Sequence, residues 1–511
     1  MIIMSTAKIG ILIVMIAYLA VILVVGFYAS GKNKTVKDFY LGGRKLGPIV
    51  TAMSAEASDM SSYLLMGLPG LAYLTGMADT GWTIIGLAAG TYLNWLIVAK
   101  RLRRYSDEIN AITIPSFFSK RYDDQKKLLT IAAALIIIIF FVPYTASGFS
   151  ACGKLFNSLF GVDYHTAMIL SAVVIIMYTM SGGFLAASMT DLIQSIVMTI
   201  ALLIVLVFGV KTAGGMNAVI ENAKSLPGYF SMTQSYDPAS KSALAYGPIT
   251  ILSTTAWGLG YFGMPHILLR FMAIDDENKI KTSRRIASAW VLIAMAIAIL
   301  IGIMGLAVSM KGIIPLLEGN ASETVIVELS NFMSEHGIIF ALAAGLVLSG
   351  ILACTMSTAD SQLLAASSSV TSDLLTDVFG IKIGEKGLLL ISRLCLAVIA
   401  VLGVVLAWNS DSSVFMIVSF AWAGFGACFG PVMLLALFWK RSNTWGALFG
   451  MIAGGIMIFV WKFAIRPRGG ILGVYELLPT FIVAIVVNVI VSLITPAPSK
   501  KITDTFDRVT L

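Results

Sequence analysis

Long apolar runs, separated by short polar segments, recur along almost the entire chain. Each run holds about 20 residues, the length that an α-helix needs to cross a hydrocarbon core of about 30 Å. The pattern therefore predicts an all-α polytopic membrane protein with about thirteen transmembrane helices. The expected spans are residues 9–28, 47–67, 80–98, 128–156, 164–181, 190–210, 246–265, 286–310, 336–370, 388–407, 413–438, 443–463 and 471–494.

The first run is predicted to be a spanning helix rather than a cleaved signal peptide. It has full spanning length and leads into Gly31-Lys32-Asn33-Lys34 without a small-residue cleavage pattern. Further along, no Pro/Ser linker, charge run or low-complexity tract is long enough to separate folded domains. We therefore expect one membrane domain that ends in a polar tail after Pro496.

Composition and charge agree with a membrane protein. Hydrophobic residues make up 58% of the 511 residues and charged residues only 12%, outside the range of soluble globular domains. The net charge of +8 follows the loops instead of forming the single basic patch that nucleic acid would favour. With the N-terminus outside, the inner segments hold 25 Lys and Arg residues and the outer ones 9. This bias predicts an outside N-terminus and a cytoplasmic C-terminus.

Two of the expected spans are interrupted. Residues 53–69 mix small and polar residues, a carboxylate and a terminal Gly/Pro pair, and residues 257–265 carry three glycines and a proline. Paired interruptions of this kind are typical of transporters with two inverted repeats. The expected organisation is a first helix and loop (1–46), a first repeat (47–210), an outer loop with the second repeat (211–440), and two final helices with the tail (441–511).

Asp59 is the most informative residue in the first interrupted span. A carboxylate within a span costs roughly 2.5–3.5 kcal/mol even on lenient insertion scales, so it needs a cation or a water-filled cavity. Main-chain carbonyls freed at a helix break can join a carboxylate and hydroxyls as ligands of a hard cation such as sodium. A position near a wet helix end, beside a Lys or Arg, is the structural alternative.

A second polar cluster lies in the expected span 336–370. It contains Cys354, Ser357, Thr358, Asp360 and Ser361. Small hydroxyl residues commonly pack membrane helices or bond their own backbone, so Ser and Thr alone indicate little. Asp360 strengthens the functional interpretation. Because inverted repeats surround one central site, this cluster and Asp59 are expected to meet.

Other candidates have both structural and functional interpretations. Asp191 opens the expected span 190–210, where a helix N-cap and an ion relay fit equally well. Trp257, Tyr261 and Tyr144 could line an apolar pocket for a small ligand, although aromatic residues at helical spacing are more often packing.

Enzymatic chemistry and ATP coupling lack support in the sequence. His165, His266 and His336 are scattered, and no Ser/His/Asp set, HExxH motif or Walker-type loop is present. The four cysteines show no CxxC or Cys/His metal spacing. We therefore do not expect an enzyme.

Five motifs resemble the sodium/solute symporter family, and the resemblance covers nearly the whole chain. They are Phe39-Tyr-Leu-Gly-Gly-Arg44 with Leu46-Gly47, Ala57-Ser-Asp-Met-Ser61 through Gly70, Ser181-Gly-Gly-Phe184 with Thr190-Asp191, Trp257-Gly-Leu-Gly-Tyr-Phe-Gly263 with Pro265-His266, and Met356-Ser-Thr358 through Leu364. The resemblance implies a leucine-transporter-like fold with a 5+5 inverted repeat and sodium as the coupling ion.

The resemblance also implies roles for individual residues. Sodium would be held by main-chain oxygens of Ala57, Met60 and Cys354 and by the hydroxyls of Ser357 and Thr358. Asp59 would support sodium binding, and Arg44 and Asp191 would serve coupling on the inner side. The favoured substrate, proline, would bind beside Ser61, Tyr144, Trp257, Tyr261, Met264 and Pro265. An additional sodium would involve Asp191, Ser357, Asp360 and Ser361.

Three departures from the family pattern leave the substrate and the ion stoichiometry open. Met264 stands where a polar Gln is expected, and Ser62-Tyr63 stand where Gly-Trp is expected. Glu56 adds a carboxylate three residues before Asp59.

The expected function is sodium-coupled symport of L-proline into the cell by alternating access. The expected location is the plasma membrane, as a bacterial inner-membrane protein, with the solute, Na+ and the lipid bilayer as partners. Neither nucleic acid nor an obligatory protein partner is expected. The nearest alternative is a sodium symporter for another amino acid, pantothenate or a sugar. A membrane sensor or channel without coupled transport is a more distant alternative.

Overall fold

The computed structural model describes residues 5–30 and 35–510 as an almost entirely helical chain. The segment Gly31-Lys32-Asn33-Lys34 lies outside the described residues. The first ten helices are α1 (Thr6–Ser30), α2 (Val36–Leu41), α3 (Pro48–Ser62), α4 (Leu68–Thr75), α5 (Met77–Leu93), α6 (Ala99–Glu108), α7 (Ile114–Arg121), α8 (Leu128–Phe160), α9 (Tyr164–Thr212) and α10 (Met216–Ser225). The others are α11 (Pro248–Thr255), α12 (Pro265–Ala273), α13 (Ile280–Met310), α14 (Val325–Ser334), α15 (Ile338–Ser368), α16 (Glu385–Leu406), α17 (Val414–Phe438), α18 (Thr444–Val460), α19 (Leu477–Ile494) and α20 (Lys500–Thr510).

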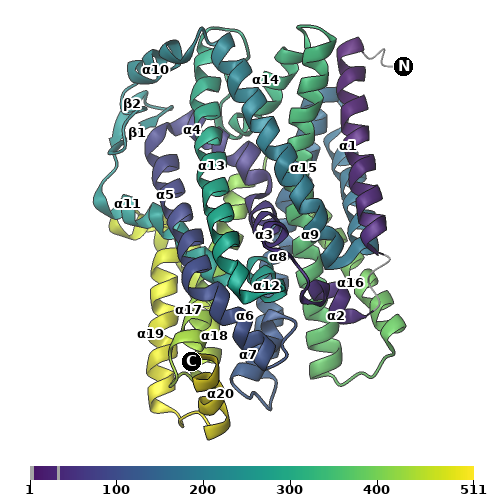
Figure 1. Cartoon of the computed structure of the whole chain (residues 1–511). Helices are drawn as coiled ribbons and strands as arrows, with labels where there is room; N and C mark the ends of the chain where they lie inside the picture. The colour runs from purple at the N-terminus through teal and green to yellow at the C-terminus, as the bar shows by residue number, and fades with distance from the viewer. Residues whose placement is uncertain (1–4, 31–34, 511) are drawn as a thin grey trace.

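The long helices run side by side, as a multi-pass membrane protein requires (Figure 1). Within the described residues, ten helices are long and apolar enough to cross a membrane. The other three expected spans fall on the shorter apolar helix Tyr164–Met180 and on the interrupted segments 48–75 and 248–273. The all-α multi-pass fold is therefore confirmed, whereas the count of thirteen stays a prediction.

Helix α3 lies within the bundle, where it packs against α9, α13 and α15 (Figure 1). Its first turn carries Pro48, where the missing N–H of proline costs no intrahelical bond. The helix breaks at Ser61, whose φ of 45° and ψ of −171° are not helical, and a π-turn over Tyr63–Gly67 leads into α4. Positive φ is uncommon for a residue with a side chain, so the surrounding packing must enforce it. After the break, the N–H of Tyr63 bonds to the carbonyl oxygens of Met60 and Ser61 in place of the regular α-helical pattern.

The second interrupted segment consists of α11, a 3₁₀ turn over Ala256–Gly263, and α12. Gly258 in this turn is in close backbone contact with α5, because a Cβ added to it would lie 2.1 Å from the carbonyl oxygen of Gly86. Met264 then takes an extended conformation, and Pro265 begins α12. Both interruptions predicted from the sequence are therefore present.

The expected spans 164–181 and 190–210 form one element, α9, with a break at Gly183 (φ 61°). Asp191 lies well past this break, inside the helix. The N-cap interpretation of Asp191 is therefore wrong, because the residue does not occupy a helix N-terminus. Helix α15 packs along α9 and also contacts α1, α3 and α8.

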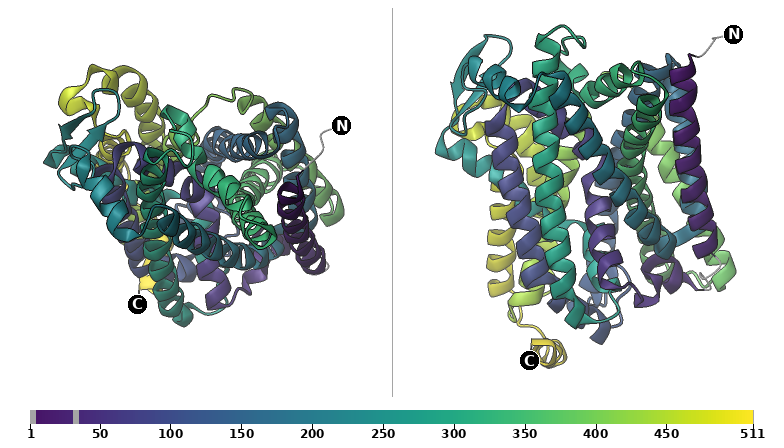
Figure 2. Two further views of the ribbon diagram at one scale, coloured as in Figure 1. Left: turned by 90° about the horizontal axis from the view of Figure 1, so that it is seen from above. Right: turned by 45° about the horizontal axis from the view of Figure 1, so that its top comes forward.

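The expected outer loop after residue 210 has structure of its own. It contains α10 and an antiparallel hairpin of β1 (Gln234–Asp237) and β2 (Ser242–Ala245), with Gln234 opposite Ala245. The hairpin lies at the end of the bundle opposite α20 (Figure 2). Neither element was predicted from the sequence.

Arg44 joins the short helix α2 to distant segments of the chain. Its guanidinium donates to the carbonyl oxygens of Met272 (2.6 Å) and Ala111 (2.7 Å), and to the hydroxyl (3.0 Å) and carbonyl (2.9 Å) oxygens of Ser106. Burial lowers the pKa of Arg44 to about 10, so the side chain stays charged at neutral pH. The structure thus shows Arg44 as a tether between loops, and its expected part in coupling stays a prediction.

Replacing Arg44 by Ala is expected to lower the free energy of unfolding by about 2–4 kcal/mol, because buried carbonyl groups lose a charged donor. Thermal unfolding of the detergent-solubilised protein, followed by tryptophan fluorescence, measures the change. Arg468→Ala removes an exposed guanidinium and is the control. Equal melting temperatures for the two variants would contradict the tether.

Candidate functional site

Asp59 lies next to the break in α3 and is almost completely buried, with 6% of its surface exposed. The hydroxyl of Tyr261, from the second interrupted segment, donates to Asp59 Oδ2 at 2.6 Å. The hydroxyl of Tyr144, from α8, lies 3.4 Å from the main-chain oxygen of Asp59. Asp59 Oδ1 has no hydrogen-bond partner among the described residues. The alternative of a wet helix end beside a Lys or Arg is therefore wrong.

Aromatic side chains enclose a small cavity beside Asp59. Met60, Tyr144 and Trp257 line it, and its volume is about 10 Å³, room for roughly a single water molecule. The indole of Trp257 stacks on Tyr63 at 5.8 Å between ring centroids and on Tyr475 at 5.1 Å. These aromatic surfaces must separate before any solute larger than a water molecule can enter.

Tyr63 also belongs to this site. From the sequence it was noted only as a difference from the family pattern and not as a site residue. Its ring lines the cavity, and its buried hydroxyl has no partner among the described residues. The buried hydroxyl of the neighbouring Ser62 is also without a partner there. A tyrosine directly after a predicted helix break was the available signal.

The expected substrate residues divide into three groups. Tyr144 and Trp257 line the cavity, and the hydroxyl of Tyr261 donates a hydrogen bond to the Asp59 carboxylate beside it. Ser61 lines an adjoining cavity of about 10 Å³. Met264 and Pro265 are buried at the start of α12 and line neither cavity in the described part of the chain.

Four of the five expected sodium ligands are linked by hydrogen bonds. Ser357 on α15 donates to the carbonyl oxygen of Ala57 on α3 at 2.8 Å and lies 3.2 Å from that of Cys354. Thr358 donates to the same Cys354 oxygen at 3.1 Å. The oxygens of α3 and α15 therefore converge, as a cation site requires. The fifth ligand, the carbonyl of Met60, accepts from the N–H of Tyr63.

Glu56 is a second buried carboxylate on α3, with 1% of its surface exposed. Its Oε1 accepts from Trp95 Nε1 at 2.9 Å and from the hydroxyl of Thr91 at 3.1 Å. These bonds connect α3 to α5 and the turn that follows it.

A polar network surrounds Asp191 and Asp360, both fully buried. Asp191 Oδ2 accepts from the hydroxyl of Ser54 at 2.6 Å and from Arg270 at 3.2 Å. Asp360 accepts from the hydroxyls of Tyr178 and of Ser361, the latter at 3.0 Å.

Three members of this network were not predicted from the sequence, namely Ser54, Tyr178 and Arg270. Arg270 is the only charged residue of the apolar helix α12, and that isolation was a usable signal. For Ser54 and Tyr178 the sequence contains no comparable signal.

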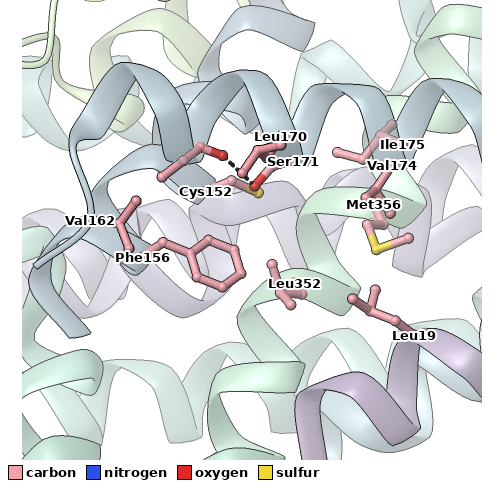
Figure 3. Close-up of a pocket in the computed structure, with 11 residues that line it drawn as sticks. Leu19, Cys152, Phe156, Val162, Leu170, Ser171, Val174, Ile175, Leu352 and Met356 are labelled. Carbon is pink, nitrogen blue, oxygen red and sulfur yellow. Dashed lines mark hydrogen bonds between the residues drawn. The ribbon is translucent and has the colours of Figure 1, made fainter. Parts of the chain in front are cut away.

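A separate pocket of about 190 Å³ lies between α1, α8, α9 and α15. Figure 3 shows its lining, which includes Leu19, Phe156, Leu352 and Met356. The hydroxyl of Ser171 on its wall bonds back to the carbonyl oxygen of Ala167 at 2.8 Å. The charged groups of an amino acid would find few partners here, so the polar site beside Asp59 is the better candidate for a zwitterion.

Comparisons with known proteins identify the family of this chain. The sodium:solute symporter family matches residues 39–454. The high-affinity proline transporter PutP of Bacillus subtilis is 41% identical over 488 residues, covering 95% of this chain and 98% of that protein. The sodium/proline symporter of Haemophilus influenzae is 40% identical over 504 residues, covering 97% of both chains.

Two solved structures share the fold at low sequence identity. A substrate-bound, outward-open Na+-coupled sialic acid symporter has a TM-score of 0.77 at 18% identity, covering 96% of this chain and 99% of that chain. MhsT in complex with L-phenylalanine has a TM-score of 0.56 at 11% identity, covering 88% and 98%.

The two interrupted helices and the polar cluster of α15, together with the family match, thus define a multi-pass secondary transporter, and the solved structures show its leucine-transporter-like fold. The chain belongs to the sodium:solute symporter family.

Proposed function

We propose that this protein carries L-proline into the cell together with sodium, by alternating access, in a bacterial plasma membrane. The observation that carries the proposal is the identity of about 40% along nearly the whole chain with the named proline transporters. Asp59 and Trp257, which line the cavity, and Tyr261, which donates to Asp59, provide the chemistry.

The proposed sodium site consists of the main-chain oxygens of Ala57, Met60 and Cys354 and the hydroxyls of Ser357 and Thr358. Sodium is cargo as well as driving ion, since it enters down its gradient. A cation here joins α3 to α15, because each helix supplies part of the oxygen set. Asp59, two residues from Ala57, adds negative charge nearby. Binding of sodium and binding of the solute then strengthen one another reciprocally.

The proposed proline site uses the break in α3. The break at Ser61 starts a new helical segment within the bundle, and the N-terminal end of such a segment would suit the carboxylate of proline. The apolar ring of proline suits the faces of Trp257 and Tyr144, which line the cavity together with Met60. Tyr261 positions the Asp59 carboxylate. Met264 and Pro265, at the start of α12, are the remaining members of the proposed proline site.

We also propose the arrangement of the chain in the membrane. Residues 47–210 form the first inverted repeat and residues 211–440 the outer loop and second repeat, with 1–46 before and 441–511 after them. The excess of Lys and Arg on one side supports an outside N-terminus and a cytoplasmic C-terminus. Arg44 and Asp191 then lie on the inner side, where they would serve coupling rather than enzymatic chemistry.

Uptake of radiolabelled L-proline into proteoliposomes tests the function. An inward sodium gradient is expected to drive proline accumulation above equilibrium, and an equal potassium gradient is not. Sodium-driven uptake of another amino acid, pantothenate or a sugar in place of proline would agree with the family but contradict proline as the substrate. Sodium flux that no solute stimulates would favour a channel instead.

A further inference from the structure

Tyr475 lies outside both proposed repeats, yet it contacts the aromatic wall of the cavity. It is found two residues before α19 begins at Leu477. Its ring stacks on the indole of Trp257, with 5.1 Å between the ring centroids and 14° between the ring planes. We infer that Tyr475 is a positioning residue of the transport site, an inference that rests on the function proposed above. It holds the indole of Trp257 in place and thereby sets the space that the ring of the solute can occupy.

Trp257 depends on neighbouring side chains for its position. It lies in the 3₁₀ turn over Ala256–Gly263, where the regular hydrogen bonding of an α-helix is interrupted. Its carbonyl oxygen accepts from Trp422 Nε1 at 2.8 Å, which fixes the main chain. The indole itself is held by ring contacts, and the one with Tyr475 is the closest and the most nearly parallel within the described chain. Stacked aromatic pairs contribute binding free energy beyond the area that they bury.

The ring of Tyr475 is fixed by two hydrogen bonds to other elements. Its hydroxyl donates to the carbonyl oxygen of Ser419 on α17 at 2.6 Å, and its main-chain N–H donates to the hydroxyl of Ser253 on α11 at 2.6 Å. The side chain is buried, with 7% of the residue exposed. Val418, which precedes Ser419 on α17, lines the cavity. Tyr475 therefore ties the start of α19 to both sides of the proposed solute site.

Buried charges anchor the start of α19. Glu476 is fully buried, its Oε2 accepts from Arg466 at 2.5 Å, and its Oε1 lies 3.8 Å from Lys462 Nζ. Both cations belong to the segment that connects α18 with α19. Leu477 packs closely on α17, because a Cβ added to Gly426 would lie 2.7 Å from Leu477 Cδ1. The last two long helices thus hold Tyr475 beside the second interrupted segment, where α11 lies close to α19 (Figure 1).

The position of the indole has a consequence for solute selection. An apolar pocket recognises a ring by the surfaces that enclose it. When the stack with Tyr475 is lost, the indole of Trp257 gains freedom. Its contact with the solute ring then becomes weaker and less selective. Proline should therefore bind less tightly, and the analogue with a six-membered ring, pipecolic acid, should be rejected less strongly.

Tyr475→Leu in proteoliposomes tests this expectation. The variant is expected to raise the KM for sodium-driven proline uptake by about 2-fold to 10-fold, the factor that an aromatic pair typically contributes, with little change in the maximal rate. Excess pipecolic acid is expected to inhibit proline uptake more strongly than in the wild type. Tyr475→Phe keeps the stacked ring and is expected to keep the wild-type KM. If Tyr475→Leu does not fold, Tyr475→Met takes its place with the same expectations.

Tyr164 provides the matched control on α9. It is also 7% exposed, and its hydroxyl donates to the carbonyl oxygen of Ala407 at 2.7 Å. Tyr164→Leu is expected to keep the wild-type KM and selectivity. An unchanged KM in folded Tyr475→Leu would overturn the inference, as would an equal rise in Tyr164→Leu. A KM in Tyr475→Phe as high as in Tyr475→Leu would also contradict it, because the stacked ring would then not position Trp257.

Hydrogen exchange measured by mass spectrometry tests the positioning without any solute. Amides of residues 256–263 are expected to exchange faster in Tyr475→Leu than in the wild type and in Tyr164→Leu, because the turn loses a packing contact. Equal exchange in all three proteins would contradict the inference. Faster exchange in Tyr475→Leu, together with a wild type that does not transport proline, would remove the proposed substrate and leave the positioning role of Tyr475 standing.

Discussion

Replacing Asp59 by Asn is expected to abolish sodium-driven proline accumulation. Asn has the same shape, and its carbonyl oxygen can still accept from Tyr261, so the cavity should persist. What disappears is the negative charge beside the proposed sodium ligands. Removing one partner of a buried charge pair costs about 3–5 kcal/mol, or roughly 150-fold to 5,000-fold in affinity. Proline uptake measured over a range of sodium concentrations tests this expectation.

Asp124 provides the matched control for Asp59. It is also 6% exposed, and it caps the start of α8 through the N–H of Leu129 at 2.7 Å, far along the chain from the site residues. Asp124→Asn is expected to keep sodium-driven accumulation. Wild-type sodium dependence in Asp59→Asn would show that the carboxylate has no part in ion binding.

The sequence predicted the features that membrane burial makes expensive. Glycine and proline within an apolar run weaken a helix, and both breaks are found where they were expected, at Ser61 and after Ala256. A carboxylate in a span needs a reason, and Asp59 lies at the aromatic cavity. The hydrogen bond from Ser357 on α15 to the carbonyl oxygen of Ala57 on α3 brings together two segments that inverted repeats are expected to place around one central site.

The network around Asp191 was harder to predict because its partners come from four helices. A single sequence shows that Asp191 is polar but not that Ser54 and Arg270 face it. The N-cap interpretation was wrong because the helix break is at Gly183, eight residues before Asp191, and that position depends on packing. The hairpin of β1 and β2 was missed because a short polar loop gives little periodic signal.

Helix ends were also beyond the reach of the hydrophobic pattern. The expected span 336–370 corresponds to α15 and a π-helical extension that reaches Val378. The expected span 286–310 begins at Ile280 as α13. Both helices continue past the apolar run into polar residues. Hydrophobicity marks the part of a helix that meets lipid, whereas backbone hydrogen bonding decides where the helix ends.

Removing the Thr358 hydroxyl is expected to raise the sodium concentration needed for half-maximal proline uptake by about 10-fold to 100-fold. Thr358 provides one of two side-chain oxygens in the proposed set, and its Oγ1 lies 3.1 Å from the Cys354 carbonyl oxygen. The estimate follows the loss typical when a single group that supports a metal ion is removed. Thr358→Ala is compared with Thr358→Ser, which restores the hydroxyl and is expected to restore the sodium affinity.

Ser349 is the matched control for the hydroxyl of Thr358. It lies on the same helix, is also buried, and donates to the carbonyl oxygen of Gly345 four residues earlier at 2.8 Å. Ser349→Ala therefore removes the same kind of bond outside the sodium site and is expected to leave the sodium dependence unchanged. If both variants shift the sodium requirement equally, α15 packing and not ligation is responsible. If only Thr358→Ala raises the sodium requirement and Thr358→Ser restores it, the hydroxyl acts as a ligand. Serine keeps the hydroxyl and lacks the methyl group, so the methyl group is then not responsible for the effect.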